Sequence, residues 1–177
     1  MRTDQVKVVN DWTADGRFIV FTVMGPRELW LLPTFGDRKP EPLLQGHGRA
    51  REAKVSPDGR WLAYVSDESG KEEVYIAGFP MPGGKRRVST NGGAQPVWRP
   101  DGKELFYLSD EGQVMAAAIR PADGEPGPAQ ALFPVPDPLS RFAVTDDGQR
   151  FIVVCQNATK EERSITVLNN WRAFQTP

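Results

Sequence analysis

The sequence is poor in the residues that form cross-links and most metal sites. Cys155 is the single cysteine and His47 the single histidine among 177 residues. One cysteine excludes an internal disulfide and any Cys-x-x-Cys motif, and its place in the apolar run 151–155 is typical of a small core residue. Because zinc sites need several His or Cys ligands, the composition excludes a zinc centre. We expect no metal ion and no cofactor.

Runs of one charge sign and long apolar runs are also missing. The chain carries 22 basic and 23 acidic residues, with a net charge of -1. A nucleic-acid-binding surface would show as a block of basic residues, so we expect no nucleic-acid partner. No apolar run approaches the roughly 20 residues of a membrane span. Residues 1–4 lead into polar sequence without the apolar core of a signal peptide, so a chain made as written is expected to be soluble and cytoplasmic.

Turn residues are abundant, with 17 glycines and 16 prolines. Four Asp-Gly pairs recur 43, 43 and 46 residues apart: Asp15-Gly16, Asp58-Gly59, Asp101-Gly102 and Asp147-Gly148. An Asp-Gly pair between two alternating apolar segments is typical of a two-residue β-hairpin turn, and residues 53–66 show it most clearly. A hairpin that recurs at a nearly fixed period indicates a structural repeat.

Large apolar residues keep a fixed register to these turns. They stand three residues before each aspartate and four and six residues after it: Trp12, Ile19 and Phe21; Val55, Leu62 and Tyr64; Trp98, Leu105 and Tyr107; Val144, Phe151 and Val153. Period-two spacing places them on one face of a small sheet, so we expect Trp12 and Trp98 in the core. With no helical pattern in the chain, the next sheet must cover each face.

These features predict an all-β fold, a β-propeller of about four blades, each an antiparallel four-stranded sheet. We expect one domain over residues 1–177, with blades near 5–45, 50–90, 94–134 and 140–170. The last repeat has no obvious fourth strand, which allows a partial propeller. A β-sandwich would explain the strand content equally well, but it gives no reason for the repeat.

The turn aspartates are expected to be structural. The carboxylates of Asp15, Asp58, Asp101 and Asp147 can accept backbone N–H bonds within their own turns. The alternative is a ring of metal ligands, which must converge on one ion. One aspartate in each blade places the four far apart, so the structural role is preferred.

Candidate binding residues lie where the innermost strands begin and line the propeller channel. Six residues before the turn aspartates stand Val9, Glu52, Gln95 and Arg141, a mixed set that suits a peptide or a small polar ligand. The alternative is that they only line a water-filled channel. His47, in a glycine-rich loop, is a further candidate. A Ser-His-Asp triad would have to use it, yet the Gly-x-Ser-x-Gly motif is absent.

Two other functions stay open. A propeller can host glycoside hydrolysis with two carboxylates alone, and Asp11, Glu52 and Glu73 are available. The sequence does not place any pair of them at a catalytic separation. A purely structural role, holding neighbouring domains, is the third reading.

Residues 55–64 (VSPDGRWLAY), followed by 73–76 (EVYI), resemble the WD40-like PD40 repeat of TolB-type β-propellers, and residues 98–107 (WRPDGKELFY) match the same motif. Residues 165–171 (ITVLNNW) resemble the C-terminal end of large bacterial propeller proteins in which such repeats follow a serine/threonine kinase or a DNA-binding domain. The first and fourth repeats depart from the motif, with Ala14 and Asp146 in place of proline.

The resemblance implies a non-catalytic scaffold that binds protein or peptide partners, within a larger bacterial sensor, signalling or envelope protein. Relatives are often periplasmic or extracytoplasmic. Because family propellers commonly have more blades, the four repeats look like the C-terminal part of a larger ring. Two outcomes remain: a small ring with an incomplete seam, or an open arc whose exposed blade edges pair with another copy to form a homo-oligomer.

Overall fold

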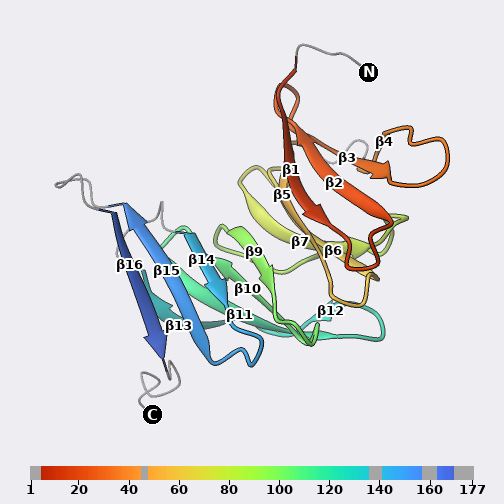
Figure 1. Ribbon diagram of the computed structural model, residues 1–177. Helices are drawn as coiled ribbons and strands as arrows, with labels where there is room; N and C mark the ends of the chain where they lie inside the picture. The colour runs from red at the N-terminus through yellow and green to blue at the C-terminus, as the bar shows by residue number, and fades with distance from the viewer. Residues whose placement is uncertain (1–4, 45–47, 136–140, 157–162, 170–177) are drawn as a thin grey trace.

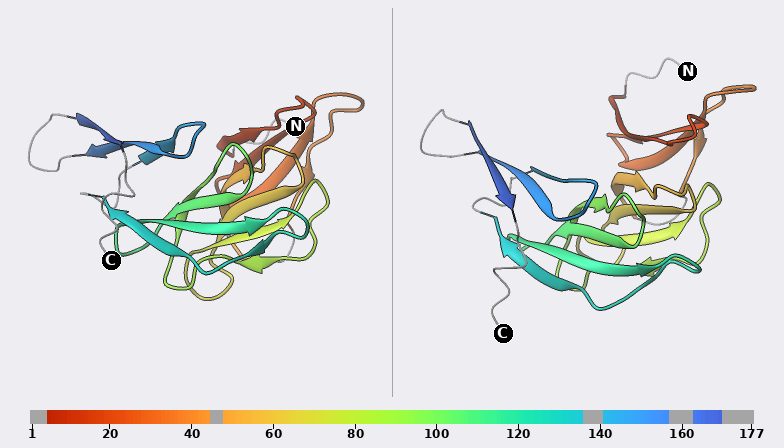
Figure 2. Two further views of the ribbon diagram at one scale, coloured as in Figure 1. Left: turned by 90° about the horizontal axis from the view of Figure 1, so that it is seen from below. Right: turned by 60° about the horizontal axis from the view of Figure 1, so that its bottom comes forward.

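The computed structural model describes residues 5–44, 48–135, 141–156 and 163–169, and all regular structure in these ranges is β-strand. The strands form four antiparallel sheets in chain order, which we number blade 1 to blade 4. Figures 1 and 2 show the blades fanned as an open arc, with blade 1 at one end and blade 4 at the other. The predicted β-propeller is confirmed as an unclosed arc.

The first two blades have four strands each. Blade 1 contains β1 (Lys7–Trp12), β2 (Phe18–Val23), β3 (Glu28–Pro33) and the short outer strand β4 (Glu41–Pro42). Blade 2 contains β5 (Ala50–Val55), β6 (Trp61–Ser66), β7 (Glu73–Gly78) and β8 (Arg86–Arg87). Proline in β4 suits an outer edge, because it cannot donate to a further strand.

Blades 3 and 4 vary this plan. Blade 3 contains β9 (Ala94–Trp98), β10 (Glu104–Leu108) and β11 (Gln113–Arg120), and β11 pairs with both β12 (Glu125–Pro126) and β13 (Gln130–Pro134). Blade 4 contains β14 (Arg141–Val144), β15 (Arg150–Gln156) and β16 (Arg163–Asn169). Within the described ranges, no helix has the length and apolarity needed to cross a bilayer.

The Asp-Gly hairpins are longer than the predicted two-residue turns. In blade 2 the connection spans residues 56–60, closed by hydrogen bonds from the N–H of Gly59 to the carbonyl of Ser56 and from the N–H of Ser56 to the carbonyl of Trp61. Gly59 has φ +70°, a left-handed conformation that favours glycine. The prediction failed because proline and serine before the Asp-Gly pair belong to the turn and not to the strand.

Each turn aspartate bonds within its own turn. Its Oδ1 accepts the backbone N–H two residues later, with N–O distances of 3.0 Å for Asp15, 3.1 Å for Asp58, 3.0 Å for Asp101 and 2.9 Å for Asp147. The hydroxyls of Thr13, Ser56 and Thr145 donate to the same oxygen in three of the turns. These contacts fit the structural role expected for the four aspartates.

The core lies between successive blades. The face of each blade that looks toward the preceding blade is its upstream face, and the opposite face is its downstream face. Val20 and Leu29 of blade 1 pack against Leu62, Tyr64 and Tyr75 of blade 2, and two similar clusters join blades 2 and 3 and blades 3 and 4. The residues four and six after each turn aspartate are buried in blades 2 to 4, as the register predicted.

The two tryptophans that stand three residues before a turn aspartate differ in how much of the side chain is exposed. The side chain of Trp98 is only 7% exposed, so its predicted place in the core is confirmed. Trp12 is 62% exposed, and its predicted core position is wrong. The physical reason is its place in the arc: β1 belongs to the first blade, where no other described sheet covers the upstream face.

Candidate functional site

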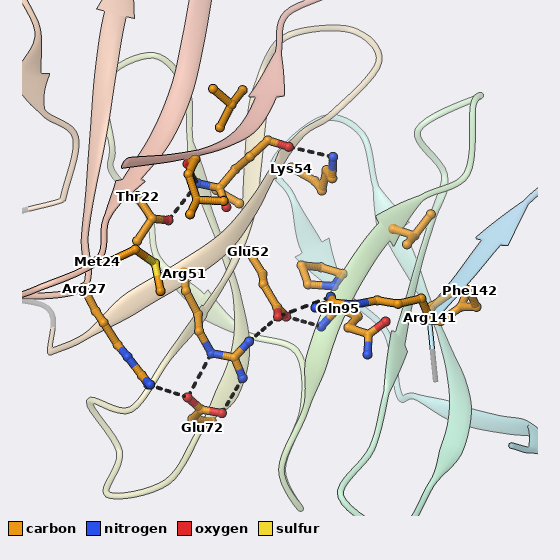
Figure 3. A pocket seen from close by; sticks show the side chains of 16 residues that line it. Thr22, Met24, Arg27, Arg51, Glu52, Lys54, Glu72, Gln95, Arg141 and Phe142 are labelled. Carbon is orange, nitrogen blue, oxygen red and sulfur yellow. Dashed lines mark hydrogen bonds and ion pairs between the residues drawn. The ribbon is translucent and has the colours of Figure 1, made fainter. Parts of the chain in front are cut away.

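The innermost strands of the four blades, β1, β5, β9 and β14, border one pocket of about 640 Å³ (Figure 3). Its lining also includes residues of the neighbouring strands and loops. The sixteen lining residues are Val8, Val9, Asn10, Thr22, Met24, Arg27, Arg51, Glu52, Ala53, Lys54, Glu72, Gln95, Pro96, Val97, Arg141 and Phe142.

Four of the five candidate binding residues meet in this pocket. It is lined by Val9, Glu52, Gln95 and Arg141, one from the innermost strand of each blade. His47, the fifth candidate, lies outside the described residues. The repeat register therefore brings residues from four blades to one place, although they are more than 130 residues apart at the extremes.

The side chains of Glu52 and Gln95 are positioned by an irregular stretch of backbone. Glu52 has φ +54° and Gln95 has φ +55°, and the pairing of β5 with β6 and of β9 with β10 shifts register at these points. A β-bulge bends a strand and redirects its side chains. Arg141, by contrast, pairs regularly with Val154. No residue pattern predicted these bulges, because glutamate and glutamine do not favour a positive φ as glycine does.

Charges alternate along one wall of the pocket. The Glu52 carboxylate forms an ion pair with Arg51, and its Oε1 lies 3.6 Å from Nη1 of Arg141. Nε of Arg51 donates to Oε1 of Glu72 over 3.0 Å, and Nη1 of Arg27 lies 3.5 Å from the same oxygen. Figure 3 shows these side chains as a continuous network from Arg27 to Arg141.

The network favours the ionised form of Glu72. The hydrogen bond from Arg51 lowers the pKa of Glu72, against an opposing effect of burial. The same bond raises the pKa of the Arg51 guanidinium. Sequence reasoning missed Arg27, Arg51 and Glu72, because they lie outside the single register position from which the site was predicted.

The carboxylates considered for hydrolysis do not face one cavity. Glu73 is fully buried inside blade 2, where its Oε2 accepts hydrogen bonds from the Ser89 hydroxyl and from the N–H of Gly92. Asp11 accepts the N–H of Val55 across the joint between blades 1 and 2, with an Oδ2–N distance of 2.8 Å. Within the described ranges, no group of three or more His, Cys, Asp or Glu could hold a metal ion.

Known proteins resemble the chain in sequence and in fold. Over 76 residues it is 34% identical to the uncharacterized peptidase YuxL of Bacillus subtilis, covering 41% of this chain and 11% of that protein. Over 130 residues it is 30% identical to tricorn protease homolog 1 of Streptomyces coelicolor, covering 69% of this chain and 12% of that protein. The chain thus spans about a tenth of the length of these curated relatives.

Among solved structures, TolB from Acinetobacter baumannii superposes with a TM-score of 0.67 at 16% identity, covering 96% of this chain and 42% of that chain. This likeness concerns the fold alone. Residues 36–169 match the family described as the lipoprotein LpqB beta-propeller domain. Because this match takes in most of the sequence, the chain belongs to the LpqB β-propeller domain family and is a propeller of the TolB-like, PD40-repeat type.

Proposed function

We propose that the chain is a non-catalytic binding platform whose pocket receives an acidic segment of a protein or peptide partner. The observation that carries this proposal is the charge of the lining. Four cationic side chains, Arg27, Arg51, Lys54 and Arg141, face two carboxylates, Glu52 and Glu72. The pocket is therefore net positive in a chain whose net charge is -1.

Arg141 is the cation best placed to meet a partner. Its side chain is 69% exposed, and its guanidinium lies 3.6 Å from Glu52, longer than a direct hydrogen bond. Arg51, in contrast, is held by two carboxylates and is only 26% exposed. A carboxylate of the partner can therefore bind Arg141 without first breaking the Arg51 network.

A binding role accounts for the pocket better than the hydrolase alternative does. Glycoside hydrolysis needs one carboxylic acid whose pKa is raised so that it can donate a proton. The pocket carboxylate Glu72 has a lowered pKa because Arg51 bonds to it. The peptidases among the relatives are many times longer than this chain, so a propeller segment that binds and orients a substrate is compatible with the proposal. We place the chain within a larger bacterial sensor, signalling or envelope protein.

Fluorescence anisotropy with a labelled hexaglutamate peptide tests the proposal, with a hexalysine peptide as the comparison. We expect the hexaglutamate peptide to bind more tightly. Arg141→Glu should weaken it about tenfold or more, because a like charge then faces the peptide. Arg120→Glu is the matched control, since Arg120 lies on β11 and pairs with Asp123 away from the pocket. Equal affinity for both peptides, or equal loss in both variants, contradicts the proposal.

A further inference from the structure

Five charged residues of the pocket form a row of alternating sign that has an arginine at each end. The order along the row is Arg27, Glu72, Arg51, Glu52 and Arg141, and its members come from blades 1, 2 and 4. Figure 3 shows Arg27 and Arg141 on opposite sides of the pocket, with the other three residues between them. Both ends of the row are therefore positive, and its middle contains two carboxylates and one guanidinium.

The middle of the row satisfies its own charges. The Arg51 guanidinium donates to both carboxylate oxygens of Glu72, a forked arrangement that is among the stronger hydrogen-bonded ion pairs. Arg51 also pairs with Glu52, whose Oε2 accepts the backbone N–H of Gln95 over 2.8 Å. With two carboxylates for one guanidinium, this central part is net negative. A carboxylate brought against it is repelled.

The two terminal arginines are held less tightly. Nη1 of Arg27 lies 3.5 Å from Oε1 of Glu72, and Nη1 of Arg141 lies 3.6 Å from Oε1 of Glu52. Their side chains are 41% and 69% exposed. A guanidinium has five N–H donors, more than one long ion pair uses, and a planar fork that fits a carboxylate. Each end of the row can therefore accept one carboxylate from a partner.

The fold sets the separation of these two ends. The backbone carbonyl of Arg27 accepts the N–H of Ala50 over 2.6 Å, which ties this end of the row to blade 2. Arg141 stands in β14 and pairs in regular register with Val154 of β15. Because both arginines extend from fixed backbone, a ligand that matches their separation binds without rearrangement of the pocket.

We propose that the pocket selects an extended partner segment with two acidic residues separated by uncharged ones, one carboxylate on Arg27 and the other on Arg141. The inference rests on the proposed function and names the class of acidic segment that the pocket takes. In an extended chain, residues four apart point to the same face and lie about 13 Å from each other. Adjacent acidic residues point to opposite faces, so they reach one arginine and not both.

Two seven-residue peptides of the same composition test this spacing by fluorescence anisotropy. Each contains two glutamates among glycine and serine, four residues apart in the spaced peptide and next to each other in the adjacent peptide. Because the total charge is equal, a difference in affinity reports the spacing alone. The spaced peptide should bind about three- to fivefold more tightly, since it forms one more ion pair with the pocket.

Substitution of each arginine identifies which carboxylate it binds. In the spaced peptide the two glutamates are replaced by glutamine one at a time, and either change should weaken binding to the wild type. In the Arg27→Gln variant one of these changes should have no further effect, and in Arg141→Gln the other. Arg120→Gln is the matched control, because Arg120 pairs with Asp123 away from the pocket. Thermal unfolding establishes that all three variants fold.

The outcomes separate this inference from the proposed function. Equal affinity of the wild type for the spaced and adjacent peptides overturns the spacing and leaves the preference for acidic ligands standing. Binding of hexaglutamate without measurable binding of the spaced peptide does the same. A spacing preference that persists in Arg27→Gln also overturns the inference, because another group then holds the second carboxylate. Equal affinity for hexaglutamate and hexalysine overturns the proposed function and the inference together.

Discussion

The carboxylate of Glu52 accepts a hydrogen bond from the backbone N–H of Gln95, with an Oε2–N distance of 2.8 Å, and so joins blade 2 to blade 3. Both residues hold a left-handed backbone, which other residues than glycine adopt only at a cost in free energy. The hydrogen bond therefore fixes two bulges that shape the pocket.

We expect Glu52→Ala to lower the free energy of unfolding by about 1.5 to 3 kcal/mol, the range for a hydrogen bond to a charged group. Glu52→Gln should cost less, because its amide oxygen can still accept the Gln95 N–H. Urea denaturation measures both variants. Equal stability of the alanine and glutamine variants would show that this bond does not hold the blades together.

We expect alanine substitutions of Trp98 and Trp12, which occupy equivalent repeat positions, to differ in their effect on stability. Trp98→Ala removes a buried aromatic side chain and its hydrogen bond to Lys54, so it should cost about 3 to 5 kcal/mol. Trp12→Ala removes an exposed side chain, so it should change the free energy of unfolding by no more than about 0.5 kcal/mol. If both substitutions lower the free energy of unfolding by the same amount, Trp12 is not exposed in the folded chain.

We expect a substitution at Tyr64 to stabilise the fold. Its side chain is fully buried, and its hydroxyl finds no hydrogen-bond partner among the described residues. Burial raises the pKa of this phenol above its usual value. Tyr64→Phe removes the unpaired hydroxyl and keeps the stacking on Tyr75. The free energy of unfolding should therefore increase by about 1 to 2 kcal/mol, and the thermal midpoint should rise with it. A loss of stability would mean that the hydroxyl is paired in solution.

The turn aspartates predict a loss of stability in acid. Hydrogen bonds from the Thr13 hydroxyl and the N–H of Arg17 hold the pKa of Asp15 below the usual value of an aspartate, and Thr145 acts in the same way on Asp147. A carboxylate with a lowered pKa in the folded state adds stability above its unfolded pKa, and this is lost as pH falls through the folded value. The free energy of unfolding should therefore decline below about pH 4.

Paired valine substitutions test the cause of that decline. Thr13→Val and Thr145→Val remove the donor hydroxyls without a large change in shape. They should give a shallower decline of stability with falling pH, whatever their cost near neutral pH. An unchanged slope would assign the acid sensitivity to other carboxylates, such as Glu72, whose pKa is also lowered.

Much of the fold follows from the register of the repeat. The alternation around Leu62 and Tyr64 identified the buried faces, because a period of two distinguishes the sides of a strand without knowledge of the whole. The same rule wrongly predicted that Trp12 is buried, since burial of a sheet face depends on whether a neighbouring sheet covers it. The position of a blade within the arc is a property of the assembly, and the local pattern does not contain it.

The repeat register also predicted part of the pocket, but not all of it. Counting back from the turn aspartates brought Glu52, Gln95 and Arg141 to one pocket, because equivalent positions of successive blades surround a common axis. Arg27 and Glu72 join the pocket through loops and side-chain pairing, which a repeat register does not encode. The bulges at Glu52 and Gln95 depend on bonds between blades, so single strands could not predict them.

The central claim, that the pocket on the innermost strands is the binding surface, is tested most directly by mapping backbone amide shifts in ¹H–¹⁵N NMR spectra. The protein is titrated with the hexaglutamate peptide. We predict that the largest shifts lie in residues 51–54, 95–97 and 141–142, which line the pocket. Shifts confined to the outer strands β4, β8 and β13, with the inner strands unchanged, would contradict the claim.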